Sequence, residues 1–280
     1  MLTGPFLSKN WMASTDNFNK ADIVMVGLPY DGTCCSRPGA RFGPADIRLS
    51  SIDIETYSPV FKKDLTDIKF YDAGELEFQF GNREDTLLKI EKAAQETFSH
   101  NKKWLGIGGE HLITLPALKA CYKKYPELSV IHFDAHADLN DTYLNESLCH
   151  STVIRRTSEF IKSENIAQIG IHSGTKEEYE WIEQHNTLVK TPDDLLKKVK
   201  NKPVYLTIDL DVLDPSVLPG TGTPEPGGMS FNELIEWFIT MQGLNIVGAD
   251  VVELSPHYDS SKVSSITAAK VIREVLFLIN

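Results

Sequence analysis

The stretch Val-Ile-His-Phe-Asp-Ala-His-Ala-Asp, residues 130 to 138, runs from a buried strand into a candidate metal site. Its apolar start is typical of a strand with both faces covered, and it ends in Asp134, His136 and Asp138. Side chains two positions apart on an extended segment project to the same side. The three side chains can therefore converge on one point just beyond the end of a strand.

A second run, Val-Tyr-Leu-Thr-Ile-Asp-Leu-Asp from 204 to 211, repeats this pattern and ends in Asp209 and Asp211. Ion pairs with Lys or Arg satisfy most acids at strand ends, but no basic residue stands beside the acids of either run. Four carboxylates crowded together without cations repel one another and resist burial. Two divalent ions would bring the local charge close to balance, so the charge pattern predicts a metal site.

A further candidate ligand is His111, which ends the run Gly-Ile-Gly-Gly-Glu-His from 106 to 111. A single histidine in a loop is usually solvated or hydrogen-bonded. This one follows a third expected strand, and the glycines before it allow close backbone approach, which favours metal binding. The run is not a phosphate loop, because it lacks both a Lys-Ser/Thr ending and the GxGxxG spacing.

Length and charge exclude several classes of protein. With 280 residues and 41% hydrophobic content the chain can bury a large core, and we expect one domain over residues 1–280. The net charge of −11 is spread along the chain without a basic cluster. This distribution argues against a nucleic-acid partner or an anionic membrane surface and suits a small cationic ligand.

The sequence also bears on cellular location. No stretch approaches the ~18 apolar residues of a membrane span, and residues 1–6 lack the charged and apolar regions of a signal peptide. We therefore expect a cytoplasmic protein. In a reducing cytosol, cysteines that form no CxxC pair are expected to be buried small hydrophobes rather than disulfides or zinc ligands. This applies to Cys34, Cys35, Cys121 and Cys149.

Short apolar runs alternate with amphipathic stretches along the chain. Strands are expected at 22–28, 68–72, 104–108, 129–134, 166–171, 204–209 and 246–253. Helices are expected at 84–98, 112–124, 192–200, 231–241 and 264–279. The alternation indicates an α/β fold with a parallel sheet and helices on both faces. In such a sheet ligands bind outside the carboxyl ends of the strands, where both acidic runs fall.

Three segments resemble signatures of the ureohydrolase family, the arginases and agmatinases. They are Gly108-Gly-Glu-His111, Asp134-Ala-His-Ala-Asp138 and Asp209-Leu-Asp-Val-Leu-Asp-Pro215, in the family's order. Two loops rich in Pro and Gly, 36–44 and 219–228, also look like those of its members. The resemblance covers nearly the whole chain. It implies a three-layer arginase/deacetylase-like α/β fold with a mostly parallel, about eight-stranded sheet flanked by helices, and a homo-oligomer, either a trimer or a hexamer.

The resemblance also implies how the ligands are shared between two metal ions. One ion would be held by His111, Asp134, Asp138 and Asp209. The other would be held by Asp134, His136, Asp209 and Asp211, so that Asp134 and Asp209 bridge the pair. An oxygen-rich set with two imidazoles suits Mn2+ better than Zn2+ or Ca2+, and we expect two Mn2+ per chain, with Fe2+, Co2+ and Ni2+ as the alternatives.

Three residues acquire catalytic roles from the resemblance. A hydroxide that bridges the metals would attack the guanidinium carbon, and Asp138 would accept a hydrogen bond from it and pass a proton to the departing amine. Glu253 would orient the guanidinium group, and His150 would be the proton shuttle. Two positions depart from the family pattern. Ser151 follows His150 where members usually have Gly, and His172, which we interpret as structural, stands where Arg is common.

The resemblance is greatest to the agmatinases, which release putrescine and urea from agmatine in polyamine metabolism. Arginase, guanidinobutyrase and formimidoylglutamase activities are the alternatives, together with a deacetylase-like hydrolase or a non-catalytic metal-binding relative. Residues 139–149 are expected to line the mouth of the site, with Asp141 and Glu146 near the tail of the substrate. These acids would repel a substrate carboxylate and favour an ammonium group. Asn140 favours the opposite, because arginases keep an asparagine there for the substrate's carboxylate.

Overall fold

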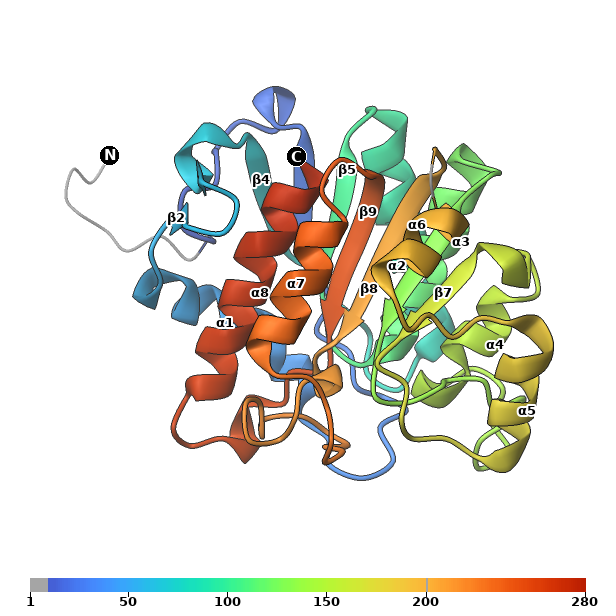
Figure 1. Ribbon diagram of the computed structural model, residues 1–280. Helices are drawn as coiled ribbons and strands as arrows, with labels where there is room; N and C mark the ends of the chain where they lie inside the picture. Colours follow the sequence, from blue (N-terminus) through green and yellow to red (C-terminus); the bar gives the residue numbers. More distant parts are fainter. Residues whose placement is uncertain (1–9, 200) are drawn as a thin grey trace, which may run out of the picture.

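Seven parallel strands form the central sheet (Figure 1). The computed structural model describes residues 10–199 and 201–280. In chain order the strands are β1 Ile23–Gly27, β4 Phe70–Glu75, β5 Lys103–Ile107, β6 Ser129–Phe133, β7 Ile166–Ile169, β8 Pro203–Asp209 and β9 Asn245–Val252. They lie in the order β4-β1-β5-β9-β8-β6-β7, and every neighbouring pair is parallel. A short antiparallel pair, β2 Tyr57–Ser58 and β3 Lys63–Asp64, forms a separate sheet.

These seven strands occur where the apolar runs predict them. Every residue of β6 and β7 is buried, and β8 and β9 each have only their first residue outside the buried class. Neither face of such a sheet contacts water, so its strands are near-continuous apolar runs rather than alternating patterns. The polar residues that do occur inside these strands are therefore exceptions that need a local explanation.

The sheet has one strand fewer than the family resemblance implies. Beyond β7, in the described part of the chain, Leu188 makes a single isolated parallel bridge to Gln168. The Thr191 hydroxyl then accepts the N–H of Asp194 at the start of α6, Pro192–Val199. Because this helix begins so soon after the bridge, the chain leaves the sheet before a full strand can form. The expected eighth strand is thus reduced to one bridge.

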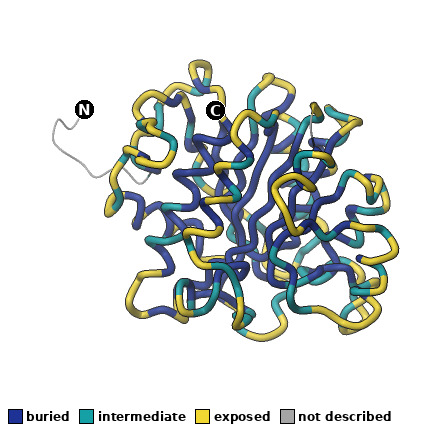
Figure 2. Tube along the Cα trace, in the orientation of Figure 1, coloured by how far each residue is buried: buried dark blue, intermediate teal, exposed yellow. Residues whose placement is uncertain are grey.

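Helices cover both faces of the sheet and bury its strands between them (Figures 1 and 2). On one face the apolar side chains of four helices join one core cluster: α1 Gly43–Ser50, α6 Pro192–Val199, α7 Phe231–Thr240 and α8 Val263–Ile279. On the other face four helices join a second cluster: α2 Arg83–Ser99, α3 Thr114–Lys124, α4 Val153–Thr157 and α5 Lys176–His185. The three-layer α/β fold predicted above is confirmed.

Three of these helices are not predicted by the sequence pattern. Helix α1 begins inside the Pro- and Gly-rich loop 36–44, where Pro44 stands in its first turn, a position that suits proline. Helix α5 begins with a capping box in which the Thr175 hydroxyl accepts the N–H of Glu178. Helix α4 has five residues and is too short to show a helical period. Helices α1 and α5 therefore have start signals that are visible in the sequence.

Two expectations concern residues that lie outside the described ranges. Residues 1–6, in which no signal peptide is predicted, are among them, and so is Lys200, the last residue of a predicted helix. Within 10–199 and 201–280, none of the helices has both the length and the apolar character that a membrane span requires.

The parallel arrangement brings the candidate site residues to one edge of the sheet. Strands β5, β9, β8 and β6 are neighbours in its middle, and their carboxyl ends share that edge. His111 follows β5 in a 3-10 helix, His111–Ile113, and Asp134 follows β6 directly. Asp209 is the last residue of β8, and Glu253 comes directly after β9. The order of the strands therefore assembles residues that are up to 142 positions apart.

Gly109 is the tightest point of this edge. A Cβ atom there would overlap the carbonyl oxygens of Leu28 and Tyr30. We predict that Gly109→Ala lowers the free energy of unfolding by at least ~2 kcal/mol, since backbone must move to admit the methyl group. Gly222→Ala is the control, because the nearest atoms to its Cβ would be Arg37 O at 3.5 Å and Glu253 Oε2 at 3.6 Å. Urea denaturation measures both, and equal midpoints would show that the close approach is unimportant.

Candidate metal and catalytic site

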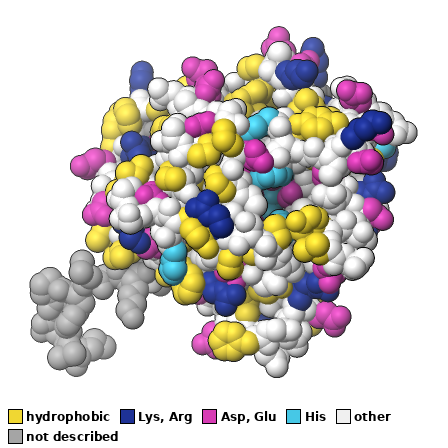
Figure 3. Space-filling model, turned by 90° about the horizontal axis from the view of Figure 1, so that it is seen from below, with side chains coloured by type: hydrophobic (Ala, Val, Ile, Leu, Met, Phe, Trp, Pro, Cys, Tyr) yellow, Lys and Arg dark blue, Asp and Glu magenta, His cyan; other side chains and the backbone are white. Residues whose placement is uncertain are grey.

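A cavity of about 290 Å³ opens at the carboxyl edge of the sheet. Histidine and acidic side chains gather in a hollow on this face (Figure 3). Of the residues proposed from the sequence, all but Asp134 line the cavity: His111, His136, Asp138, His150, Asp209, Asp211 and Glu253. Asp134 lies beneath them and is 1% exposed. The structure thus brings together every metal ligand and catalytic residue proposed from the sequence.

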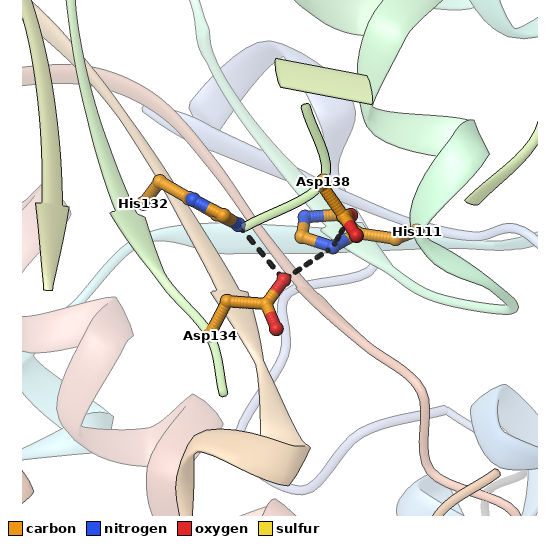
Figure 4. A group of neighbouring side chains, drawn as sticks. All are labelled: His111, His132, Asp134 and Asp138. Carbon is orange, nitrogen blue, oxygen red and sulfur yellow. Dashed lines mark hydrogen bonds and ion pairs between the residues drawn. The ribbon is translucent and has the colours of Figure 1, made fainter. Parts of the chain in front are cut away.

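His111 is the centre of the first cluster of ligand atoms. Its Nδ1 lies 3.0 Å from Asp134 Oδ2, 3.1 Å from Asp138 Oδ2 and 3.3 Å from Asp209 Oδ2. Figure 4 shows that the ring of His111 and the carboxylates of Asp134 and Asp138 point toward one another. One imidazole nitrogen and three carboxylate oxygens from three strand ends therefore converge within the space of one coordination sphere.

His136 is the centre of the second cluster. Its Nδ1 lies 2.9 Å from Asp211 Oδ2 and 3.6 Å from Asp134 Oδ1. Backbone groups fix these carboxylates, since Asp134 Oδ1 accepts the N–H of His136 at 2.6 Å and Asp211 Oδ1 accepts the N–H of Ala135 at 3.1 Å. Asp134 is common to both clusters, as a bridging ligand must be.

Three of the four carboxylates in this group, Asp138, Asp209 and Asp211, resist ionisation, whereas, despite its burial, the neighbouring histidines hold the pKa of Asp134 well below its usual range. Burial raises the pKa of Asp209 well above its usual range, and the neighbouring Asp211 raises it further. Burial and the charge of Asp134 raise the pKa of Asp138 to about 7. Burial alone would lower the pKa of His111, but the nearby carboxylates of Asp134, Asp138 and Asp209 raise it well above its usual value. Positive charge among these oxygens is therefore strongly favoured.

The chemistry of the donor atoms fits divalent cations. His111 Nδ1 is buried and makes no hydrogen bond of good geometry, although three carboxylate oxygens surround it. A nitrogen lone pair among oxygens that repel one another suits a metal ion better than a proton. The residues that line the cavity include no Lys or Arg within the described part of the chain. Basic side chains are thus not available inside it to balance the acids.

His132 is a member of the first cluster that the sequence analysis does not name. It lies on β6 and is fully buried, with Nε2 2.8 Å from Asp134 Oδ2 (Figure 4). It stands two residues before Asp134, so the alternation along the strand could have revealed it. The Nε2 of His132 and the Nδ1 of His111 both approach Oδ2 of Asp134. The contact with His132 therefore helps to orient this carboxylate.

Two of the proposed catalytic residues have left-handed backbone conformations. The φ angle of Asp138 is 51° and that of Glu253 is 69°. Residues other than glycine rarely adopt this region, and such strain is concentrated at functional sites. In Glu253 the conformation lets the N–H donate to Gly109 O at 2.8 Å while Oε1 accepts the N–H of His111, also at 2.8 Å. The side chain is 6% exposed and faces the cavity.

His150 lies at the rim of the cavity, at the start of the 3-10 helix His150–Thr152. Its N–H donates to Thr33 Oγ1 at 3.2 Å, and Thr33 Oγ1 in turn donates to Glu110 Oε1 at 2.6 Å. The ring Nε2 lies 3.5 Å from Cys35 Sγ. Burial lowers the pKa of His150, which favours a neutral ring that can accept a proton. Cys35 is exposed and Cys34 is half-buried, so the expectation of buried cysteines is wrong at these two positions and confirmed at Cys121 and Cys149.

The predicted acids at the mouth of the site do not face the cavity. Asp141 is exposed and pairs with Arg156, and Glu146 pairs with Arg83 at 2.5 Å. That part of the expectation is wrong, because arginines distant in sequence hold both side chains elsewhere. Of the segment 139–149, Asn140 and Tyr143 line the cavity.

The acid that lines this part of the cavity is Glu178, which the sequence analysis does not name. Its Oε1 accepts the N–H of Leu139 at 2.9 Å and its Oε2 accepts the N–H of Thr175 at 2.8 Å. The capping pattern before α5 was the available signal. His172 belongs to neither cluster of candidate ligands in the described residues, and its Nδ1 lies 2.7 Å from Gly170 O.

Comparison with known proteins shows to which family this chain belongs. The sequence model of the Arginase family matches residues 21–278. The agmatinase of Bacillus subtilis (strain 168) is 43% identical over 279 residues, with 97% of this chain and 96% of that protein covered. Two solved structures are also similar. Proclavaminate amidino hydrolase from Streptomyces clavuligerus is 31% identical with a TM-score of 0.90, over 98% of this chain and 97% of that one. Agmatine ureohydrolase of Thermoplasma volcanium is 28% identical with a TM-score of 0.87, over 98% and 95%.

The chain therefore belongs to the Arginase family, as the three sequence signatures predict. It is a hydrolase that acts on the C–N bond of a guanidino group, and within the family it is most like the agmatinases. The His and Asp clusters give it a candidate divalent-metal site.

We predict that the protein binds close to two Mn2+ per chain and that Asp211→Asn reduces this number. The variant removes an anionic oxygen that lies 2.9 Å from His136 Nδ1. His172→Asn is the control and should retain the metal content, because His172 is outside both clusters. Atomic emission after dialysis measures the bound metal. Loss of both ions in the His172 variant would mean that the ligands are wrongly assigned.

Proposed function

We propose that the protein is an agmatinase, which hydrolyses agmatine to putrescine and urea with two Mn2+. The observation that carries the proposal is the cavity itself. At its floor it presents acids and imidazoles in the clusters of a metal pair, and its lining has no Lys or Arg in the described residues. A substrate with a cation at each end suits such a cavity better than one that ends in a carboxylate.

The proposed metal ligands are those implied by the sequence. His111, Asp134, Asp138 and Asp209 would hold one Mn2+, and Asp134, His136, Asp209 and Asp211 would hold the other. The role of Asp209 as a shared ligand is supported by its position, since Oδ2 faces His111 Nδ1 while Oδ1 accepts the N–H of Asp211 at 2.9 Å. Two bound ions would supply a bridging hydroxide at neutral pH, which a resonance-stabilised guanidinium carbon requires as nucleophile.

Protein side chains perform the remaining steps of the proposed mechanism. Glu253 orients the guanidinium group through charge-assisted hydrogen bonds, and its own carboxylate is held in place by the N–H of His111. Asp138 accepts the proton of the attacking nucleophile and transfers it to the departing amine. His150, at the rim, exchanges protons between the cavity and solvent. Its neutral ring and its position on the cavity wall support this role.

The tail of agmatine would extend toward Asn140, Tyr143 and Glu178. The carboxylate of Glu178 is 5% exposed and is the acid on this side of the cavity. It takes the place of Asp141 and Glu146 in favouring an ammonium group. Each of its oxygens accepts one backbone N–H and keeps a lone pair for a second donor.

A guanidino acid or arginine is the second candidate substrate, and two observations favour it. Asn140 lines the cavity and is a neutral donor that can bind a carboxylate. Arg37 lines a small adjoining cavity next to Cys35 and Glu253. The guanidinium of Arg37, however, lies over the ring of Tyr258, 4.1 Å from its centroid. It is thus engaged away from the main cavity, and we place agmatine first.

Two wider predictions rest on the family resemblance alone: assembly into homo-trimers or homo-hexamers, and a role in polyamine metabolism that supplies putrescine. A third, the cytoplasmic location, comes from the sequence rather than from the family. Light scattering of the purified protein gives the molar mass of the assembly and therefore tests the predicted number of chains.

We predict that His150→Asn retains both metal ions but lowers kcat by ~100-fold or more, which is the usual contribution of positioned proton transfer. The side chain of His150 belongs to neither ligand cluster of the described residues. Steady-state urea release and metal content are measured on the same preparation. Unchanged turnover would reduce His150 to a loop histidine, and loss of metal would make it a ligand.

We predict that agmatine exceeds arginine and guanidinobutyrate in kcat/KM by at least ~10-fold, about 1.4 kcal/mol of transition-state binding. The physical reason is that a carboxylate would meet Glu178 in a cavity that lacks a lining Lys or Arg among the described residues. Urea release from the three compounds at equal concentration measures this. Arginine turnover as efficient as that of agmatine would overturn the assignment of substrate while leaving the metal chemistry intact.

A further inference from the structure

A row of buried polar side chains crosses the middle of the sheet below the proposed metal site. Gln168 of β7 is in register with His132 of β6, His132 with Thr207 of β8, and Thr207 with Asp250 of β9. All four side chains are 0% exposed. The proposed reaction uses none of them, and polar groups inside a parallel sheet are costly unless each finds a partner. The row therefore needs an explanation of its own.

Thr207 connects this row to the metal site. The second ring nitrogen of His111, Nε2, lies 3.0 Å from Thr207 Oγ1. Nδ1 of the same ring faces the carboxylates and must carry a lone pair if it is to hold a metal ion. The ring proton then has to be on Nε2, so Nε2–H donates and Thr207 Oγ1 accepts. The hydroxyl hydrogen of Thr207 must in turn be donated to another group.

Asp250 is the acceptor that this chain of donors requires. Thr207 is the register neighbour of Asp250, so its hydroxyl and this carboxylate lie side by side in the sheet. Thr207 Oγ1 also lies 3.4 Å from Thr114 Oγ1, where either hydroxyl can be the donor. Tyr205 O–H donates to Oδ2 at 2.6 Å, whereas Oδ1 is buried and has no hydrogen bond of good geometry. Because a hydroxyl hydrogen can rotate, Thr207 can direct its hydrogen to the neighbouring carboxylate of Asp250 rather than to Thr114. On the other side of Asp250, the neighbouring residue in β5 is Gly106, whose lack of a side chain leaves room for Asp250. A Cβ atom on Gly106 would lie 3.0 Å from the Cβ of Asp250.

The other proposed histidine ligand has no such need. His136 is 27% exposed at its side chain, and its Nε2 faces Glu225 Oε1 at 3.8 Å near the surface. Water can satisfy that nitrogen, whereas the Nε2 of His111 is enclosed with a side chain only 1% exposed. The buried chain from His111 to Asp250 is thus specific to the ligand that solvent cannot reach.

We propose that Asp250 is a positioning residue that acts through the Thr207 hydroxyl to hold His111 with its proton on Nε2 and its Nδ1 free toward the metal site. This inference rests on the proposed metal-dependent function. Ligating histidines are commonly oriented by an acceptor on their second nitrogen, and loss of such a partner typically weakens metal binding ~10- to 100-fold. Here the Thr207 hydroxyl stands between the two groups: it accepts the N–H of the imidazole and donates its own hydrogen to the carboxylate.

The alternative role for Asp250 is purely structural, as the acceptor of the Tyr205 hydroxyl inside the core. The two roles differ in what they affect. A structural acceptor contributes to the stability of the fold without a specific effect on Mn2+ affinity, whereas a positioning residue affects the affinity and does so only when Thr207 can transmit its effect. Binding of Mn2+ to the metal-free protein, measured from the electron paramagnetic resonance of free Mn2+, separates them.

The first comparison is between a variant that removes the Thr207 hydroxyl and a variant that keeps it. Thr207→Val removes it at nearly constant shape and should weaken Mn2+ binding by at least ~10-fold, while Thr207→Ser keeps it and should stay within ~3-fold of the wild type. Thr157→Val is the matched control. Thr157 is likewise fully buried, and its hydroxyl donates to Val153 O at 2.8 Å in α4. This variant should bind Mn2+ like the wild type even if its unfolding temperature falls.

The second comparison concerns Asp250 itself. Asp250→Leu removes the acceptor and should weaken Mn2+ binding by at least ~10-fold, and Asp250→Asn, which retains an acceptor oxygen, should lose less. If Asp250 acts through Thr207, the double variant Thr207→Val with Asp250→Leu should bind no more weakly than the weaker single variant. Fully additive losses would overturn the relay. If Asp250→Leu fails to fold, Asp250→Asn replaces it in the same cycle.

Each result has one meaning. Folded Thr207→Val that binds Mn2+ as tightly as the wild type contradicts the inference, and so does an Asp250→Asn variant that loses more affinity than Asp250→Leu. A wild-type protein that binds no Mn2+ contradicts the proposed function instead. The measurement uses no substrate, so the choice between agmatine and arginine does not affect it.

Discussion

Mutual repulsion among buried carboxylates is the constraint on which this structure depends. Asp134, Asp138, Asp209 and Asp211 lie at one edge of the sheet, each with a side chain no more than 6% exposed. Burial and mutual charge raise the pKa of three of them, Asp138, Asp209 and Asp211. A fold that keeps such groups together must compensate their charge, and two histidine rings do so only in part. Divalent cations would complete the compensation and would convert a destabilising cluster into a reactive one.

The fold meets this constraint through topology and backbone conformation. Parallel pairing delivers residues from β5, β6, β8 and β9 to a common edge, so no long loop is needed to assemble them. Left-handed backbone at Asp138 and Glu253 turns two carboxylates into the cavity where regular strand geometry would not. Below them, the buried row that ends at Asp250 supplies hydrogen-bond partners for groups that water cannot reach. The buried row thus supports the geometry of the candidate metal site above it.

Much of this arrangement is predictable from the sequence, for identifiable reasons. Strands such as β6, β7, β8 and β9 are buried on both faces and appear as continuous apolar runs, and the ligands alternate at strand ends. Other features depend on contacts between distant residues. Asp141 and Glu146 are directed away from the cavity by Arg156 and Arg83, and nothing in the local sequence indicates these pairs. His132 stands two residues before Asp134 in the same motif, so its role could have been predicted from the alternation along β6. Asp250 is a single acid within an apolar strand, and its role follows only from strand register. The eighth strand is lost because α6 starts early.

The most direct test of the account is anomalous X-ray diffraction from crystals grown with Mn2+, recorded at the manganese edge. The account predicts two anomalous peaks about 3.5 to 4 Å apart, both in contact with Asp134 and Asp209, with His111 on one and His136 on the other. It also predicts that His132 contacts Asp134 and neither ion. A single peak held by His132 in place of Asp209, or no peak within the acidic cluster, would contradict it.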